Sequence, residues 1–187
     1  NGNDIFLKTT PIEVLAFNEW FFHPLISESL AGFILPNCNA VKETIKHAGD
    51  HLKELKVSTS FDGYQSNDRS KVEAMAHALY LALQKGLKIK YINPPSSFEE
   101  TGQKILFPDE ILNISRGTCL DLALFYAACI ERIGLYPLVF IVPGHAFLGI
   151  WLSKEDHINF WKKEAELEED FKKKPVADAQ EAAESYF

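Results

Sequence analysis

The sequence predicts an α+β fold in which helical segments come first and two adjacent strands follow them. Apolar residues recur at helical spacing, or fill most of a segment that ends at a glycine, in three stretches: residues 39–55, 68–84 and 119–133. Residues 138–142 and 146–152 are rich in β-branched and aromatic side chains, and Pro143 and Gly144 separate them. We therefore expect two strands joined by a turn after the third helix.

The remaining elements are shorter. An irregular edge strand is expected within residues 5–22, where Pro11 interrupts the apolar runs, and a short strand over residues 87–92, where apolar and basic residues alternate. A short helix is expected over residues 109–113, because Pro108 suits the first turn of a helix. The segment from Lys162 is dense in charge and has the composition of an exposed helix.

Length and charge limit the classes of protein. The chain has 187 residues, of which 47% are hydrophobic, which is enough for one buried core, so we expect a single domain over residues 1–187. A net charge of -7 without a long basic stripe excludes nucleic acid as a direct ligand. No apolar run is long enough for a membrane span, and the polar first residues do not resemble a signal peptide, so a cytoplasmic location is expected.

Cys119 is the strongest candidate for a catalytic residue. It follows Gly117 and Thr118 and opens the apolar helix, where the unpaired backbone N–H groups of the first turn favour a reactive thiolate. His145, which follows Gly144 on a predicted strand, is the candidate base. The alternative for Cys119 is a buried structural cysteine, which is common on apolar helices. The two glycine-led turns favour the catalytic interpretation.

Other polar residues have simpler interpretations. The three cysteines are an odd number, and two of them share one helix too far apart to form a disulfide, so reduced thiols are expected. Asp121 lies in the first turn of a helix, where a carboxylate is explained by the helix dipole. His47 and His51 are four residues apart, but they lack a third ligand and favour a polar helix face. No metal and no cofactor is predicted.

Several motifs occur in an order that points to a known family. They are Gly102-Gln103-Lys104-Ile105, Arg116-Gly117-Thr118-Cys119-Leu120-Asp121 and Gly144-His145-Ala146-Phe147. In this order they resemble the transglutaminase-like branch of the papain-type cysteine enzymes. Further stretches are similar to a bacterial transglutaminase-like domain of the kind found in large multidomain proteins: Asn18-Glu19-Trp20, Leu30-Ala31-Gly32-Phe33 and Pro94-Pro95-Ser96-Ser97-Phe98. The resemblance covers about residues 5–152, and residues 153–187 form a charged, helical extension outside it.

The resemblance implies a transglutaminase-like or papain-like fold, in which a buried cysteine helix packs on an antiparallel sheet and additional helices precede it. It also implies acyl transfer, in which the Cys119 thiolate attacks a peptide or glutamine-type amide and His145 moves the proton. Gln103 is then a candidate donor to the oxyanion, or else a loop glutamine that bonds local backbone. Trp151 is in phase with His145 along the strand and is a candidate substrate contact.

A groove lined by aromatic side chains is a further expectation, with the alternative that these side chains fill the core. The candidates are Tyr64, Phe98, Tyr126 and Trp151.

The third member of the expected triad is not assigned. In the family an Asp or Asn follows the histidine strand, but an extended chain would carry Asp156 about 30 Å or more from His145. Glu155 shares this difficulty, and Glu164 and Glu166 lie in the segment with helical composition. We therefore expect the orienting group to lie beyond residue 187 in a longer parent protein, or to be absent.

The sequence and the resemblance together predict a cysteine-dependent protease or amidase that hydrolyses a protein or peptide amide through a Cys119 thioester. The expected partners are this substrate and other domains of a longer parent protein. The alternative is a catalytically silent module that keeps the cleft to bind a peptide or a neighbouring domain.

Overall fold

The computed structural model describes residues 12, 14–22, 24–93 and 103–173. Parts of the expected elements lie outside these residues. They are the start of the edge strand (5–11), the loop with Phe98 and the segment that holds Pro175.

Three helices form the main core. Helix α1 (Asn39–Glu54) packs on α2 (Arg69–Leu81), and both contact α4 (Cys119–Arg132). A π-helical turn, η2 (Ala82–Gly86), continues α2. Fully buried apolar side chains from all three helices fill the space between them: Val41, Leu52, Val72, Met75, Leu79, Phe125 and Ile130. The three predicted helices are confirmed. They are stable together because their apolar faces bury one another.

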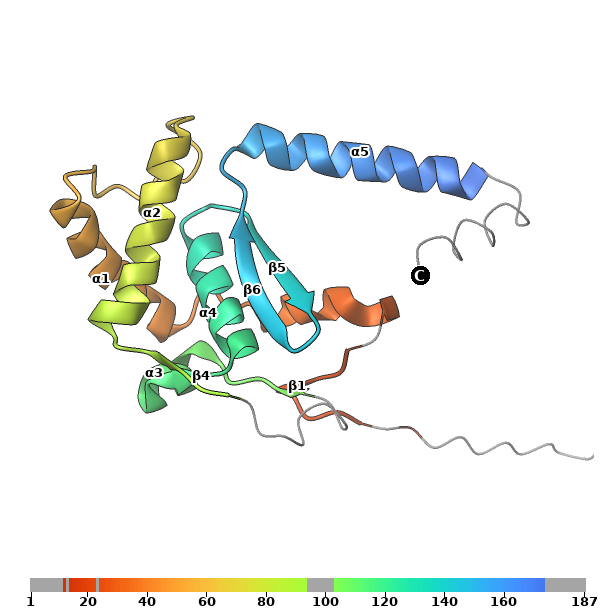
Figure 1. Cartoon of the computed structure of the whole chain (residues 1–187), viewed down its shortest axis with the longest axis horizontal. Helices are drawn as coiled ribbons and strands as arrows, with labels where there is room; N and C mark the ends of the chain where they lie inside the picture. The colour runs from red at the N-terminus through yellow and green to blue at the C-terminus, as the bar shows by residue number, and fades with distance from the viewer. Residues whose placement is uncertain (1–11, 13, 23, 94–102, 174–187) are drawn as a thin grey trace, which may run out of the picture.

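A β-hairpin covers another side of α4 (Figure 1). Strand β5 (Pro137–Val142) pairs antiparallel with β6 (His145–Ile150), with Val142 opposite His145. Gly144 has φ +73°, a backbone conformation that glycine adopts without strain, so the two-residue turn forms where the sequence predicts it. The fold is therefore α+β, with the buried helix α4 packed on an antiparallel hairpin.

Two short pairings bring distant segments to the start of α4. Strand β1 (Glu19–Trp20) pairs antiparallel with β3 (Gln103–Lys104), and β2 (Lys90–Tyr91) pairs parallel with β4 (Arg116–Gly117). A second cluster of buried apolar side chains lies where they meet the helix and the hairpin: Trp20, Leu30, Ile105, Leu120, Ala123, Leu124 and Ala146.

Some elements differ from the expectation. The strand expected over residues 87–92 shrinks to β2, because Lys88 has φ +55° and interrupts an extended chain. Of the edge strand expected within residues 5–22, the described part forms only β1, and a 3₁₀ helix, η1 (Pro24–Phe33), follows it. The short helix α3 spans Pro108–Ile114, close to the expected 109–113.

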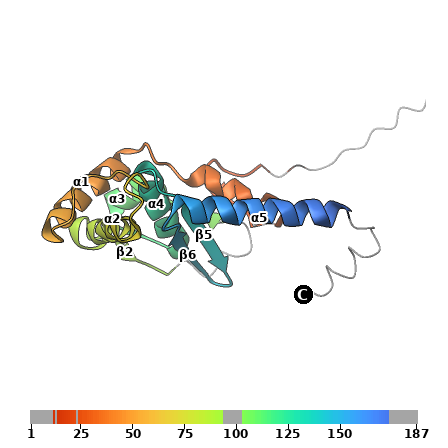
Figure 2. The ribbon, with the colours of Figure 1, turned by 90° about the horizontal axis from the view of Figure 1, so that it is seen from above.

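The last described helix, α5 (Lys154–Lys173), begins well before Lys162. The Ser153 hydroxyl accepts a hydrogen bond from the Asp156 N–H at 3.0 Å and caps the first turn. The helix extends away from α1 and α2 (Figures 1 and 2). None of the helices in the described residues combines the length and the apolar character that crossing a membrane requires.

Candidate active site around Cys119

A capped helix start fixes the position of Cys119. The Thr118 hydroxyl accepts a hydrogen bond from the Asp121 N–H at 3.4 Å, and the Asp121 carboxylate accepts one from the Thr118 N–H at 2.9 Å. Gly117, just before the cap, is buried, and a Cβ there would lie 3.1 Å from Asp121 Cβ and from Leu122 Cδ2. The sequence Gly-Thr-Cys therefore lets β4 run directly into α4 with the thiol on its first residue.

Asp121 has a structural role in this arrangement. Its side chain is 1% exposed, and Oδ2 accepts a second bond from the Thr118 hydroxyl at 2.9 Å. Oδ1 accepts from the Leu106 N–H at 2.9 Å and so connects the segment after β3 to α4. Both carboxylate oxygens are occupied by these contacts, as expected for a residue that stabilises the helix start.

Cys119 and His145 line the same cavity, which has a volume of about 380 Å³. Its walls come from the end of α2, the region of β2, the first turns of α4 and the start of β6: Tyr80, Leu83, Gln84, Ile89, Tyr91, Cys119, Leu122, Ala123, Tyr126, His145, Ala146, Phe147 and Leu148. Cys119 is half-buried and His145 is exposed. The volume falls within the roughly 300–1,000 Å³ of small-molecule sites.

The imidazole of His145 makes no hydrogen bond within the part of the chain that is described, either to the Cys119 thiol or to a carboxylate. Asp156 instead accepts a hydrogen bond from the Arg69 guanidinium at 2.6 Å. Glu164 and Glu166 lie on α5, not on a strand opposite His145. No third residue of a triad is thus assigned among the described residues.

The other residues singled out from the sequence lie in different places. Gln103, on β3, pairs with Trp20 and is not part of the cavity wall. Trp151 follows β6 and packs against His157 and Phe160, with ring centroids 5.9 and 5.2 Å apart, so it does not line the cavity either.

Among the aromatic candidates, Tyr126 lines the cavity, and its hydroxyl donates to the Ala76 carbonyl at 2.7 Å. Tyr64 lines a different cavity of about 590 Å³ between α1, the segment after it and the end of α4, and its hydroxyl donates to the Trp151 carbonyl at 2.7 Å. Of the three groove candidates among the described residues, Tyr126 lines the cavity of Cys119. The fourth candidate, Phe98, lies outside the described residues.

Sequence reasoning missed the wall that faces Cys119 from the end of α2. Tyr80, Leu83 and Gln84 lie there, and Tyr91 lies on β2. The apolar periodicity of α2 was visible in the sequence, but nothing local indicated that its last turn would face the start of α4.

The three thiols have different environments. Burial raises the pKa of Cys129, which is fully buried on the inner face of α4, and burial also raises the pKa of Cys38. Cys119 is the cysteine that lines the cavity.

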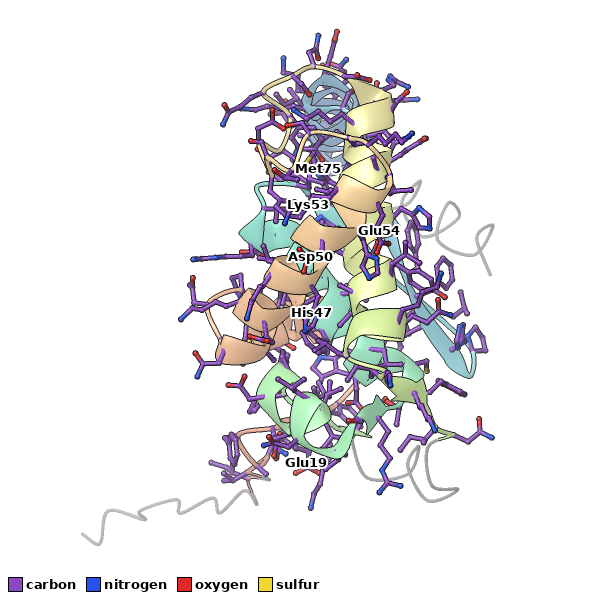
Figure 3. The ribbon with its side chains drawn as sticks, turned by 90° about the vertical axis from the view of Figure 1, so that its left-hand side faces the viewer. Glu19, His47, Asp50, Lys53, Glu54 and Met75 are labelled. Carbon is purple, nitrogen blue, oxygen red and sulfur yellow. The ribbon has the colours of Figure 1, made fainter. Side chains whose placement is uncertain are left out.

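The histidines of α1 lie beside glutamates of the same helix: the distance from His47 Nε2 to Glu43 Oε1 is 3.7 Å, and that from His51 Nδ1 to Glu54 Oε2 is 3.1 Å. Figure 3 shows His47 and Glu54 along α1 with Asp50 and Lys53. Within the described ranges, no three potential metal ligands gather in one place.

No protein-family model, curated protein or solved structure matches the chain.

Proposed function

We propose that the chain is a cysteine-dependent acyl-transfer enzyme with a transglutaminase-like or papain-like core, which hydrolyses protein or peptide amides at the cavity of Cys119 and His145. The supporting observation is that a thiol on the first residue of a capped helix shares one cavity with the only histidine on the adjacent strand. This combination suits nucleophilic catalysis, because the base moves the proton of the thiol.

In the proposed reaction the Cys119 sulfur bonds to the carbonyl carbon of the amide, and the C–N bond breaks. His145 passes the proton taken from the thiol to the leaving amine. Water then attacks the thioester, His145 accepts its proton, the C–S bond breaks, and the acid leaves with the thiol restored.

Backbone N–H groups of the first turn of α4 would stabilise the oxyanion, because the first residues of a helix have no acceptors within the helix. Gln103 lies outside the cavity wall and is not needed for this role.

The second candidate function is a catalytically silent module that binds a peptide or a neighbouring domain in the same cavity. The observation that favours it is the exposed imidazole of His145, which has no hydrogen-bond partner in the described part of the chain. Without such a partner, no hydrogen bond fixes the tautomer of the ring.

Turnover of a fluorogenic peptide-amide pool tests the proposal, together with intact-mass detection of an acyl group on the protein after an acid quench. We expect Cys119→Ala and His145→Ala to abolish both signals, and Cys38→Ala to preserve them, because Cys38 lies outside the cavity wall. Peptide binding of equal affinity in wild type and Cys119→Ala, without turnover or acylation, would contradict the enzyme and favour the binding module.

A further inference from the structure

The free edge of β6 faces the cavity. Within the described residues, β6 pairs with β5 alone. Four consecutive residues of β6, from His145 to Leu148, line the cavity. Successive side chains of a strand point to opposite faces of the sheet. Four consecutive residues therefore line the same cavity when that cavity lies along the edge of the strand.

The pairing with β5 determines which backbone groups point into this edge. The Trp151 N–H donates to the Tyr136 carbonyl at 3.2 Å, and Pro137 faces Ile150. Because hydrogen-bonded and non-hydrogen-bonded pairs alternate in an antiparallel ladder, His145 and Phe147 direct their N–H and C=O groups to β5.

Ala146 and Leu148 therefore direct their backbone groups away from β5, toward the cavity. No backbone partner is found among the described residues for the N–H and C=O groups of these two residues. Unpaired N–H and C=O groups along a strand edge form a template for another extended chain.

The cavity wall carries apolar side chains beside polar ones such as Gln84. Leu83, Ile89 and Leu122 contribute to it from three different segments. A strand beside β6 would direct every second side chain toward this wall and the others away from it.

We infer that the cavity binds an extended peptide, which pairs with the backbone of Ala146 and Leu148 as a third strand. Apolar side chains at alternate positions of the peptide contact the wall of Leu83, Ile89 and Leu122. The bound chain passes His145 at the start of β6 and thereby reaches the thiol of Cys119. This inference deepens the proposed function, on which it rests for the identity of the peptide as a substrate.

Amide hydrogen exchange on the full chain tests the pairing. The probe is acetyl-(Ser-Leu)₃-amide, added to Cys119→Ala so that no turnover occurs. In the free protein we expect the Ala146 and Leu148 amides to exchange fast and the Phe147 amide to exchange slowly. The peptide should slow the exchange of the first two amides by about tenfold or more and leave that of Phe147 unchanged.

Slow exchange of Ala146 and Leu148 without peptide would overturn the inference, because the edge would already be covered by this chain or by a second copy. Fast exchange at a saturating concentration of peptide would overturn it as well.

Two N-methylated peptides provide a matched control. One carries N-methyl groups on its three serines and the other on its three leucines, so each removes the N–H groups of one side of the strand. We expect one of them to bind about tenfold or more weakly than the other, because only one set of N–H groups meets β6. Equal affinities would contradict strand pairing.

The failures of the two proposals are distinguishable. Protection of Ala146 and Leu148 in a protein that shows no acylation at Cys119 would contradict the enzyme and leave the peptide site standing. Acylation at Cys119 without protection of these amides would contradict the peptide site alone.

Discussion

The Asp121 carboxylate accepts hydrogen bonds from both the backbone N–H and the hydroxyl of Thr118, each at 2.9 Å. Its other oxygen accepts from the Leu106 N–H, so one buried side chain joins the helix start to the segment after β3. The position of Cys119 between these two residues depends on this contact. The proposed chemistry therefore depends on a carboxylate that takes no part in it.

We expect Asp121→Ala to lower the free energy of unfolding by about 3 kcal/mol, because it leaves the buried N–H of Thr118 and the partly buried N–H of Leu106 without their acceptor. Asp121→Asn keeps one acceptor oxygen and should cost less. Urea unfolding of the three proteins measures the difference. Stability of Asp121→Ala within about 0.5 kcal/mol of wild type would contradict the structural role of this carboxylate.

A larger side chain at Gly117 is expected to destabilise the fold. Gly117→Ala places a methyl group 3.1 Å from Asp121 Cβ and Leu122 Cδ2, and it should lower the free energy of unfolding by about 1–3 kcal/mol. Gly49→Ala is the control, because its Cβ meets nothing within 4 Å and its position in α1 favours a gain of about 1 kcal/mol. Thermal unfolding compares the two variants, and equal effects would contradict the close approach at Gly117.

The helices and the hairpin could be predicted because their signals are local. The periodicity of α1, α2 and α4 and the Pro143-Gly144 turn are visible in short windows of sequence. The pairing of β1 with β3 joins residues 19–20 to 103–104, and no local pattern indicates such a contact. The 3₁₀ helix η1 has three residues per turn and matches neither the helix nor the strand period.

The start of α5 could have been found from the sequence. Ser153 and Asp156 have the spacing of a helix cap, and the structure shows the hydrogen bond between them.

Within the site, Cys119 and His145 were predicted from their glycine-led turns, whereas the facing wall depends on how the end of α2 packs. Gln103 and Trp151 were chosen from resemblance and strand phase, and neither lines the cavity.

We expect iodoacetamide to alkylate Cys119 faster than Cys38 or Cys129. Cys119 is half-buried beside a cavity at a helix N-terminus, whereas burial raises the pKa of the other two thiols and lowers their thiolate fraction near neutral pH. Peptide mapping by mass spectrometry over a time course measures the three rates. Faster labelling of Cys129 than of Cys119 would show that the helix opens readily and would contradict this arrangement.

Amide hydrolysis by the chain is expected to be slow. No carboxylate bonds His145 in the described part of the structure, and loss of the equivalent support costs a serine triad roughly 10⁴-fold in turnover. The fluorogenic peptide-amide pool should therefore yield slow turnover, while the thiol still reacts with electrophiles. Rapid hydrolysis would contradict the expectation and indicate a complete triad.

The dependence of Cys119 alkylation on His145 tests the proposed pair of residues most directly. The measurement compares the rate of iodoacetamide labelling at Cys119 in wild type, His145→Ala and His47→Ala, because His47 lies on α1 beside Glu43 and is not part of the cavity wall. If the imidazole acts on the thiol, His145→Ala should slow the labelling by about tenfold or more, and His47→Ala should leave it unchanged. Equal rates in all three proteins would contradict a functional thiol and imidazole pair in this cavity.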